Sequence, residues 1–278
     1  MSATVIDGRD ASRRVVFTAL GRELVGRART ALVALTQTCF RTAAVYPMDS
    51  VTARVRATGA WILWDLSHSV GAFPVDLHAS GAELAVGCTY KYCNGGPGAP
   101  AFLYVRRDLQ EQLRSPIQGW FGHADPFAFG LDYRPAAGVS RFLAGTPGVL
   151  SMACAEPGLD LLLEAGMERI WEKSQLLSAY LMDRAETLLG PYGVTVATPR
   201  EGRGSHVSLR HPEAWRLTQS LIGDYGVIPD FRAPDLIRFG LAPLYNTFEE
   251  VEEALARLRM ALARKSYEKY EAARLAVT

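Results

Sequence analysis

The sequence predicts an α/β protein in which a mostly parallel sheet with helices is followed by a smaller α+β domain. Short, almost continuous apolar runs alternate with a helical stretch in the first half of the chain, and shorter strand candidates lie between helices in the second half. Apolar strands separated by a helix are typical of parallel sheets, which are buried on both faces. A chain of 278 residues is long enough for a larger and a smaller domain.

Four strands are expected in the larger domain. The first covers residues 30–36, and it is followed by a helical stretch that opens at Pro47 and closes at Gly59. The other apolar runs with the length of buried strands are Trp61–Leu66, Leu84–Cys88 and Pro100–Val105.

The second half is expected to be richer in helix. One long helix is predicted over Leu159–Leu189, where Gly190 and Pro191 end it, and a last helix runs from Phe248 to about Ala272. Short strands are expected between these helices at 194–198, 206–209 and 236–241. We therefore predict three parts: an N-terminal segment over 1–29, a truncated larger domain over 30–156, and a long linking helix with a small domain over 157–278.

Composition excludes several classes of protein. Thirty basic and twenty-nine acidic side chains leave a net charge of +1, so a nucleic-acid or anionic-membrane partner is not expected. No apolar run approaches the length of a membrane span, and no secretory leader pattern opens the chain. The four cysteines form no CxxC pair and have no histidine at zinc-ligand spacing. A cytoplasmic protein without a metal site is the expectation.

The residues with the clearest chemical meaning follow two of the predicted strands. Asp65 lies at the carboxyl end of one strand, where ligands gather in α/β sheets, and His68 comes three residues later. Lys91 lies between an apolar strand and the glycine-rich turn Gly95–Gly98. A lysine that forms a Schiff base, with a carboxylate that pairs with the pyridinium nitrogen, is what pyridoxal 5′-phosphate (PLP) requires. Taken alone, such a pair also fits a helix cap and a solvated lysine.

A collinear series of motifs from about Leu35 to Lys265 favours the PLP interpretation. The series consists of Trp64–His68, Ala72–Leu77, Gly87–Ala101, Gly119–His123, Arg141–Pro147, Gly204–Val207 and Arg238–Tyr245. Together these stretches resemble kynureninase. The resemblance implies a partial PLP-dependent transferase fold of type I, in its class V branch, and a hydrolase that cleaves the β–γ carbon bond of a kynurenine.

On this resemblance, five residues would hold or assist the cofactor from the strand ends. Lys91 would form the Schiff base and Asp65 would pair with the pyridinium nitrogen. His68 would lie close to the ring face or its phenolic oxygen, and Tyr90 would reach the phosphate and relay protons. Thr36 matches a hydroxyl position near the cofactor.

Four further residues take their roles from the resemblance alone. Trp120 and Thr146 match positions that bind the phosphate end, in this fold often from the neighbouring subunit. Arg238 matches the arginine that clamps the substrate α-carboxylate, and His123 matches a residue near the substrate's aromatic ring. A core role for Tyr90 and Trp120, and an ion pair at a strand edge for Arg238, are the competing interpretations.

The sequence also departs from this family. Its members begin with a substantial N-terminal portion, which carries the phosphate loop and the aromatic that stacks on the ring, and which is not recognisable here. The family's Asn-Tyr-Arg/Lys-Thr-Gly stretch reads Cys39–Ala43. Three hypotheses follow: one half of a split enzyme completed by a partner polypeptide or a second subunit, a non-catalytic or repurposed partner in a biosynthetic pathway, or a broken remnant.

The expected substrate is a small amino acid, kynurenine or 3-hydroxykynurenine, and the expected products are an anthranilate and alanine. The expected assembly is a homodimer or a hetero-oligomer. A class V desulfurase or lyase is the runner-up, and it would require a reactive cysteine near Arg238, where the sequence places none.

Overall fold

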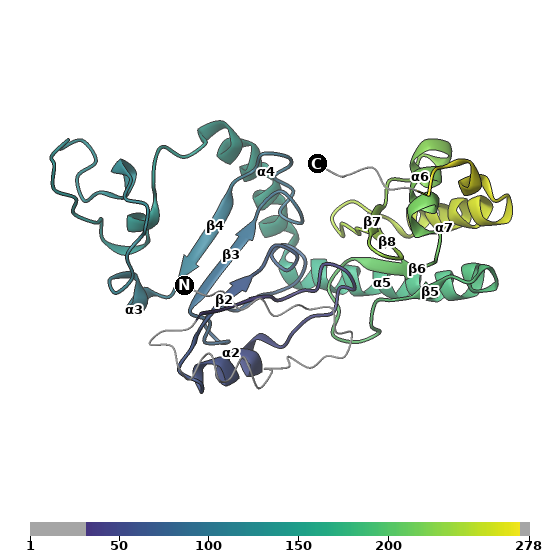
Figure 1. Ribbon diagram of the computed structural model, residues 1–278, viewed down its shortest axis with the longest axis horizontal. Helices are drawn as coiled ribbons and strands as arrows, with labels where there is room; N and C mark the ends of the chain where they lie inside the picture. Colours follow the sequence, from purple (N-terminus) through teal and green to yellow (C-terminus); the bar gives the residue numbers. More distant parts are fainter. Residues whose placement is uncertain (1–31, 273–278) are drawn as a thin grey trace. The chain divides into compact units, whose positions relative to one another are not determined.

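The computed structural model describes residues 32–272, which form two compact units (Figure 1). The first unit contains residues 32–37, 47–70 and 75–161, and the second contains 38–46, 71–74 and the chain from residue 162 onward. The two short segments 38–46 and 71–74, expected in the larger domain, therefore belong to the second unit. The expected N-terminal segment 1–29 lies outside the described residues.

The first unit is built on a four-stranded sheet with the order β1-β2-β3-β4, and Figure 1 shows β2, β3 and β4 next to one another. The strands are β1 (Leu32–Thr36), β2 (Trp61–Asp65), β3 (Leu84–Cys88) and β4 (Ala101–Val105). The first three are parallel, and β4 runs antiparallel to β3. No helix lies between β3 and β4, and a parallel crossover usually needs one, so the short connection returns the chain in the opposite direction.

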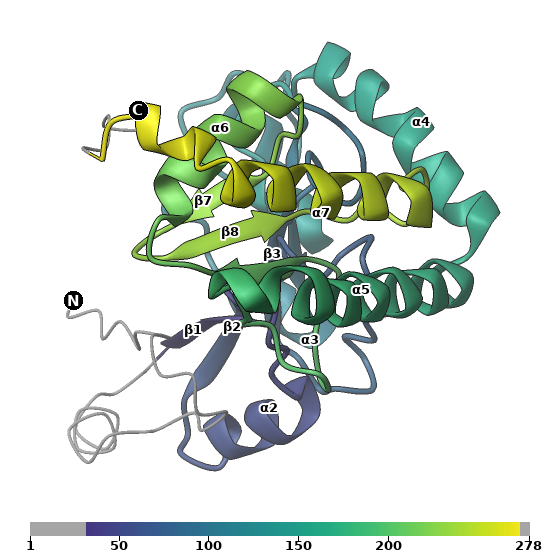
Figure 2. The ribbon, with the colours of Figure 1, turned by 90° about the vertical axis from the view of Figure 1, so that its right-hand side faces the viewer.

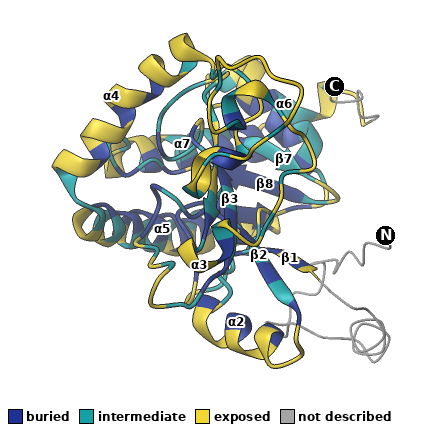
Figure 3. Ribbon diagram, turned by 90° about the vertical axis from the view of Figure 1, so that its left-hand side faces the viewer, coloured by how far each residue is buried: buried dark blue, intermediate teal, exposed yellow. Residues whose placement is uncertain are grey.

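Helix α2 (Met48–Arg56) follows β1 and packs on the sheet through one face. Its buried side chains include Val51, Thr52 and Val55, whereas its other face is exposed (Figure 3). The indole nitrogen Nε1 of the fully buried Trp64 donates a hydrogen bond to Oγ1 of Thr52 at 3.0 Å. This bond satisfies the one polar atom that the tryptophan carries into the core.

The prediction of a single long helix over 159–189 was wrong, because two helices occupy this region. Helix α4 (Val149–Ala165) begins before the expected start, and α5 (Met167–Leu189) follows it. Gly166, between the two helices, has a φ angle of +81°, a left-handed conformation that favours glycine and interrupts the helical path. The short helix α3 (Arg107–Gln110), which was not predicted, follows β4.

The second unit contains an antiparallel sheet with the order β5-β6-β8-β7. Its strands are β5 (Thr195–Val196), β6 (Val207–Arg210), β7 (Asp230–Arg232) and β8 (Leu236–Phe239). Helices α5, α6 (Ala214–Tyr225) and α7 (Phe248–Ala263) lie over this sheet (Figure 2). Strand β7 and helix α6 had no individual prediction, and the last helix ends at Ala263 rather than near residue 272.

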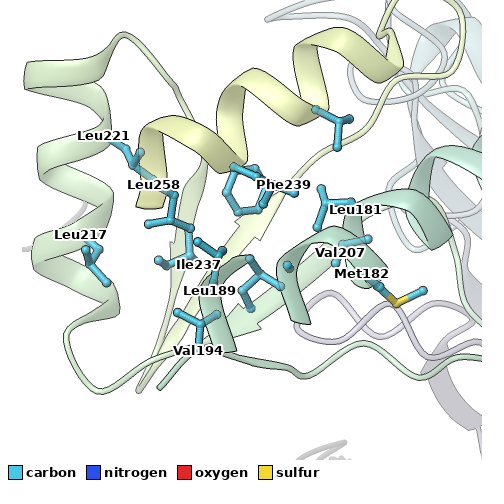
Figure 4. Close-up of a cluster of buried hydrophobic side chains, with 14 of the residues drawn as sticks. Leu181, Met182, Leu189, Val194, Val207, Leu217, Leu221, Ile237, Phe239 and Leu258 are labelled. Atoms are coloured by element: carbon cyan, nitrogen blue, oxygen red, sulfur yellow. The ribbon is translucent and has the colours of Figure 1, made fainter. Parts of the chain in front are cut away.

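The core of the second unit lies between this sheet and its helices (Figure 4). Val207 and Leu209 of β6 and Ile237 and Phe239 of β8 point into it, together with leucines from α5, α6 and α7. Because side chains alternate along a strand, the residues between them, such as Arg238, lie on the opposite face of the sheet.

A capping box stabilises the start of α7. The backbone nitrogen of Glu250 donates to Oγ1 of Thr247 at 3.2 Å, and the nitrogen of Thr247 donates to Oε2 of Glu250 at 2.9 Å. Within residues 32–272, no helix is long and apolar enough to cross a membrane.

Candidate functional site

Three parallel strands bring the predicted cofactor residues to one edge of the first sheet. Thr36 and Asp65 end β1 and β2 and are paired in register. Oγ1 of Thr36 donates to the backbone carbonyl of Asp65 at 3.5 Å. Strand β3 ends at Cys88, and Lys91 follows on the next loop. The carboxyl ends of parallel strands meet at the same edge, which is where open α/β sheets bind ligands.

A tight turn after β2 directs His68 toward the lysine. Oδ1 of Asp65 accepts a hydrogen bond from the backbone nitrogen of Ser67 at 2.9 Å, and the nitrogen of Ser69 donates to the carbonyl of Leu66 at 2.8 Å. Nδ1 of His68 then lies 3.5 Å from Nζ of Lys91. The structure therefore brings Asp65, His68 and Lys91 into one region of the first unit.

The loop that carries Lys91 is closed by its own backbone. The nitrogen of Gly95 donates to the carbonyl of Thr89 at 2.9 Å, and the nitrogen of Asn94 donates to the carbonyl of Lys91 at 3.0 Å. A Cβ at Gly95 would lie only 2.7 Å from Cβ of Ala99, so this position requires glycine. The lysine is thus mounted on a compact turn, and its side chain is half-buried.

Tyr90 lies beside the lysine but is not a core residue. Its side chain is 49% exposed, and the centre of its ring lies 5.3 Å from Nζ of Lys91. This distance is within the range of a cation–π contact. The exposure excludes the core interpretation for Tyr90 within the described residues.

Trp120, His123 and Thr146 occupy the long connection between α3 and α4 in the first unit. Trp120 opens the 3-10 helix η1 (Trp120–Gly122) and its half-exposed ring packs edge-on against Phe121 and Phe127. Nδ1 of His123 accepts from the backbone nitrogen of Asp125 at 2.9 Å, so this ring stabilises its own loop. Thr146 is exposed. None of the three makes a hydrogen bond or ring contact with Lys91 among the described residues.

Arg238 lies in the second unit, on the sheet face opposite the core. Its Nε lies 2.9 Å from Oδ1 of Asp230, and its Nη2 lies 2.6 Å from Oδ2 of the same carboxylate. Its Nη1 donates to the backbone carbonyl of Phe40 at 2.7 Å. The ion pair that the sequence left open as an alternative is therefore present, and Asp230 is a residue of this site that the sequence did not indicate.

The segment 38–46 also brings a cysteine toward Arg238, which corrects the expectation that none lies there. Cys39 is partly exposed and directly precedes Phe40, whose carbonyl binds the arginine. The other cysteines lie in the first unit. Among them, Cys93 is buried, and the pKa of its thiol is raised to about 11. Burial is the larger cause, and the charge of the nearby Cys88 is the smaller one.

The chain is similar in sequence to proteins of known function. Residues 170–258 match the kynureninase C-terminal domain family. The chain is 44% identical over 240 residues to a kynureninase from Pseudomonas fluorescens, an alignment that covers 86% of this chain and 58% of that protein. It is 42% identical over 252 residues to a kynureninase from Burkholderia mallei, covering 90% of this chain and 60% of the relative.

Solved structures show the same fold at lower sequence identity. A cysteine desulfurase from Thermococcus onnurineus superposes with a TM-score of 0.70 at 20% identity, covering 87% of this chain and 62% of the desulfurase. An alanine–glyoxylate aminotransferase from Nostoc gives a TM-score of 0.66 at 21% identity, covering 88% of this chain and 66% of that enzyme. These superpositions show the PLP-dependent transferase fold, and at such low sequence identity they show nothing beyond the fold.

The chain spans about three-fifths of the kynureninases that it matches, since it covers 58% and 60% of the two relatives above. Their sequence identity, the family match in the second unit and the shared fold agree with the motifs first seen in the sequence. Over most of its length, this chain is similar in sequence to kynureninases.

Proposed function

We propose that this chain carries the lysine-bearing part of a PLP site and acts as a kynureninase-like hydrolase. The reaction would cleave the β–γ carbon bond of kynurenine or a substituted kynurenine to an anthranilate and alanine. The observation that carries the proposal is the approach of Lys91 to His68, 3.5 Å apart at the strand edge where Asp65 ends β2. These residues belong to a chain that is 44% identical to a kynureninase.

The residues at this edge fit the chemistry of PLP. The half-buried amine of Lys91 can hold the cofactor covalently, and the carboxylate of Asp65 is the group that pairs with a pyridinium nitrogen. Gly95–Gly98 lack side chains at most positions, so the backbone there can approach a planar ring closely. When bound, PLP supplies an electron sink that stabilises negative charge next to the substrate α-carbon.

The side chains of the chain itself have separable tasks in this proposal. His68 exchanges a proton with the amine of Lys91, which must be neutral to act as a nucleophile or a base. Tyr90, which lies against that amine, relays protons. Arg238 binds the substrate α-carboxylate through its planar guanidinium.

The remaining roles are assigned by similarity to kynureninases. Thr36 lies near the cofactor, and Trp120 and Thr146 contribute to the phosphate end. His123 lies near the aromatic ring of the substrate. Because Trp120 and Thr146 make no hydrogen bond or ring contact with Lys91 within residues 32–272, we propose that they serve the site of a second subunit. Another polypeptide would supply the phosphate loop.

The experiment is a titration with PLP combined with a measurement of anthranilate release from kynurenine. It is run on the chain alone and with a polypeptide equivalent to the part of the relatives that the chain does not span. We expect weak binding and negligible turnover by the chain alone, and recovery of both with the added polypeptide. Tight binding and full turnover without it would contradict the need for a partner. PLP binding without turnover in any combination would favour a non-catalytic role.

A further inference from the structure

The guanidinium of Arg238 is already bound by a carboxylate of the same chain. Asp230 lies opposite Arg238 in the register of β7 and β8, and both of its oxygens accept hydrogen bonds from the arginine at 2.6 to 3.0 Å. This bidentate arrangement is the one that a free carboxylate would also adopt on an arginine. A substrate carboxylate and Asp230 would therefore compete for the same edge of Arg238.

Burial decides which partner of the arginine can give way. The side chain of Arg238 is only 10% exposed, so an incoming carboxylate has little room beside the existing partners. The carbonyl of Phe40, bound at 2.7 Å, belongs to the backbone of segment 38–46. Asp230, by contrast, is a side chain that is 44% exposed and can rotate away.

A second arginine is placed to receive the displaced carboxylate. Nε of Arg232 lies 3.1 Å from Oδ1 of Asp230, and its Nη2 lies 3.5 Å from Oδ2. Arg232 and Asp230 lie two residues apart in β7, so their side chains are on the same face of the strand. Asp230 can therefore leave Arg238 without losing an ionic partner, which lowers the cost of its displacement.

We propose that Asp230 is a positioning residue that occupies Arg238 until a ligand carboxylate displaces it, and that Arg232 holds Asp230 in the displaced position. The inference rests on the proposed role of Arg238 in binding the substrate α-carboxylate. In addition to that role, Asp230 competes with ligand carboxylates for Arg238 and thereby sets their affinity. Arg232 holds the displaced Asp230 and thereby makes the exchange possible.

The test measures carboxylate binding directly and needs neither cofactor nor turnover. The full chain is labelled with ¹⁵N-arginine, and the Nε–H resonance of Arg238 is assigned from its loss in Arg238→Lys. Sodium propionate is titrated at constant ionic strength, with propionamide as the neutral control. The variants are Asp230→Asn, Arg232→Gln and the double variant. Arg210→Gln is the matched control, because Arg210 pairs with Asp235 in the same sheet.

The expected effects have opposite signs. Asp230→Asn should bind propionate at least about fivefold more tightly, because the internal competitor has lost its charge. Arg232→Gln should bind it more weakly, because Asp230 then has no second arginine to move to, and this effect should be small in the double variant. Arg210→Gln should behave like the unmodified chain.

Two results would overturn the proposal while leaving a carboxylate role for Arg238 intact. One is weaker or unchanged propionate binding in Asp230→Asn. The other is an equal loss of propionate affinity in Arg232→Gln and Arg210→Gln. If propionate shifts the Nε–H resonance of Arg238 neither in the unmodified chain nor in any variant, Arg238 does not bind carboxylates. The gating role of Asp230 then fails as well. The assignment of Lys91 would be unaffected, because it is tested by the cofactor and not by propionate.

Discussion

The amine of Lys91 lies 3.5 Å from Nδ1 of His68, a residue that precedes it by 23 positions. The contact exists because β2 and β3 are parallel and end at the same edge of the sheet. A turn stabilised by the Asp65 carboxylate then directs the imidazole toward the lysine.

Replacing His68 with Phe should slow the reaction of the chain with PLP. The amine reacts only when it is neutral, and the imidazole is the proton acceptor that the structure places next to it. We expect the visible band of the lysine-bound cofactor to form at least about tenfold more slowly, a modest share of what a positioned acid or base contributes. Stopped-flow absorbance measures the rate. His78→Phe, an exposed histidine of the same unit, is the control, and equal rates in the two variants would remove His68 from the account.

The two cysteines Cys93 and Cys154 should differ strongly in reactivity. Burial raises the pKa of the Cys93 thiol to about 11, so almost none of it is thiolate near neutral pH. Cys154 is exposed on α4. Alkylation with iodoacetamide, followed by peptide mass spectrometry, should label Cys154 well before Cys93. Simultaneous labelling in the folded chain would show that Cys93 is not buried as described.

Acid should destabilise the second unit through His211. Burial lowers the pKa of His211 below its ordinary value of about 6.5, so the unfolded state binds a proton more readily than the folded state. The contribution of His211 to the free energy of unfolding is fully present at pH values above about 6.5. It is lost as the pH falls through the lower pKa that the folded state has.

His211→Asn tests this directly, because an asparagine oxygen can still accept the hydrogen bond that Nδ1 accepts from the nitrogen of Glu213 at 3.0 Å. Urea unfolding across the acid range should show a smaller loss of stability in the variant than in the unmodified chain. Parallel pH profiles would contradict the assignment.

Loss of the capping box should destabilise α7. Thr247→Ala removes the side-chain oxygen that accepts from the nitrogen of Glu250, and we expect a cost of about 1 kcal/mol in the free energy of unfolding. Thr187→Ala is the control, since Oγ1 of Thr187 donates to the carbonyl of Asp183 inside α5 and caps no helix start. Urea unfolding followed by circular dichroism measures both. An equal cost at the two positions would indicate that the cap contributes nothing of its own.

Much of the first unit could be predicted from the sequence, because its strands are short apolar runs with clear limits. The region 84–88 was predicted with its exact ends, and the positions of Asp65 and Lys91 after their strands followed from the same pattern. The helix break at Gly166 was missed because one glycine inside a helical pattern is usually tolerated, and only its positive φ reveals the end.

The partners of Arg238 could not be predicted from the sequence. Strand β7 has three residues, too few for an alternating pattern to be recognised, so its pairing with β8 was not expected. Phe40 is separated from Arg238 by 198 positions. The assignment of Arg238 to a carboxylate therefore came from family resemblance, whereas its competitor Asp230 became visible only in three dimensions.

We propose that Lys91 is the residue that holds PLP, and chemical reduction of the bound cofactor identifies that residue. The chain, with the complementing polypeptide, is incubated with PLP, treated with borohydride and digested for mass spectrometry. We expect a pyridoxyl label on the peptide that contains Lys91, and no label in Lys91→Ala, whereas Lys173→Ala is labelled normally. A label on Lys173, Lys265 or Lys269 that persists in Lys91→Ala, with the Lys91 peptide unmodified in the unsubstituted chain, would contradict it.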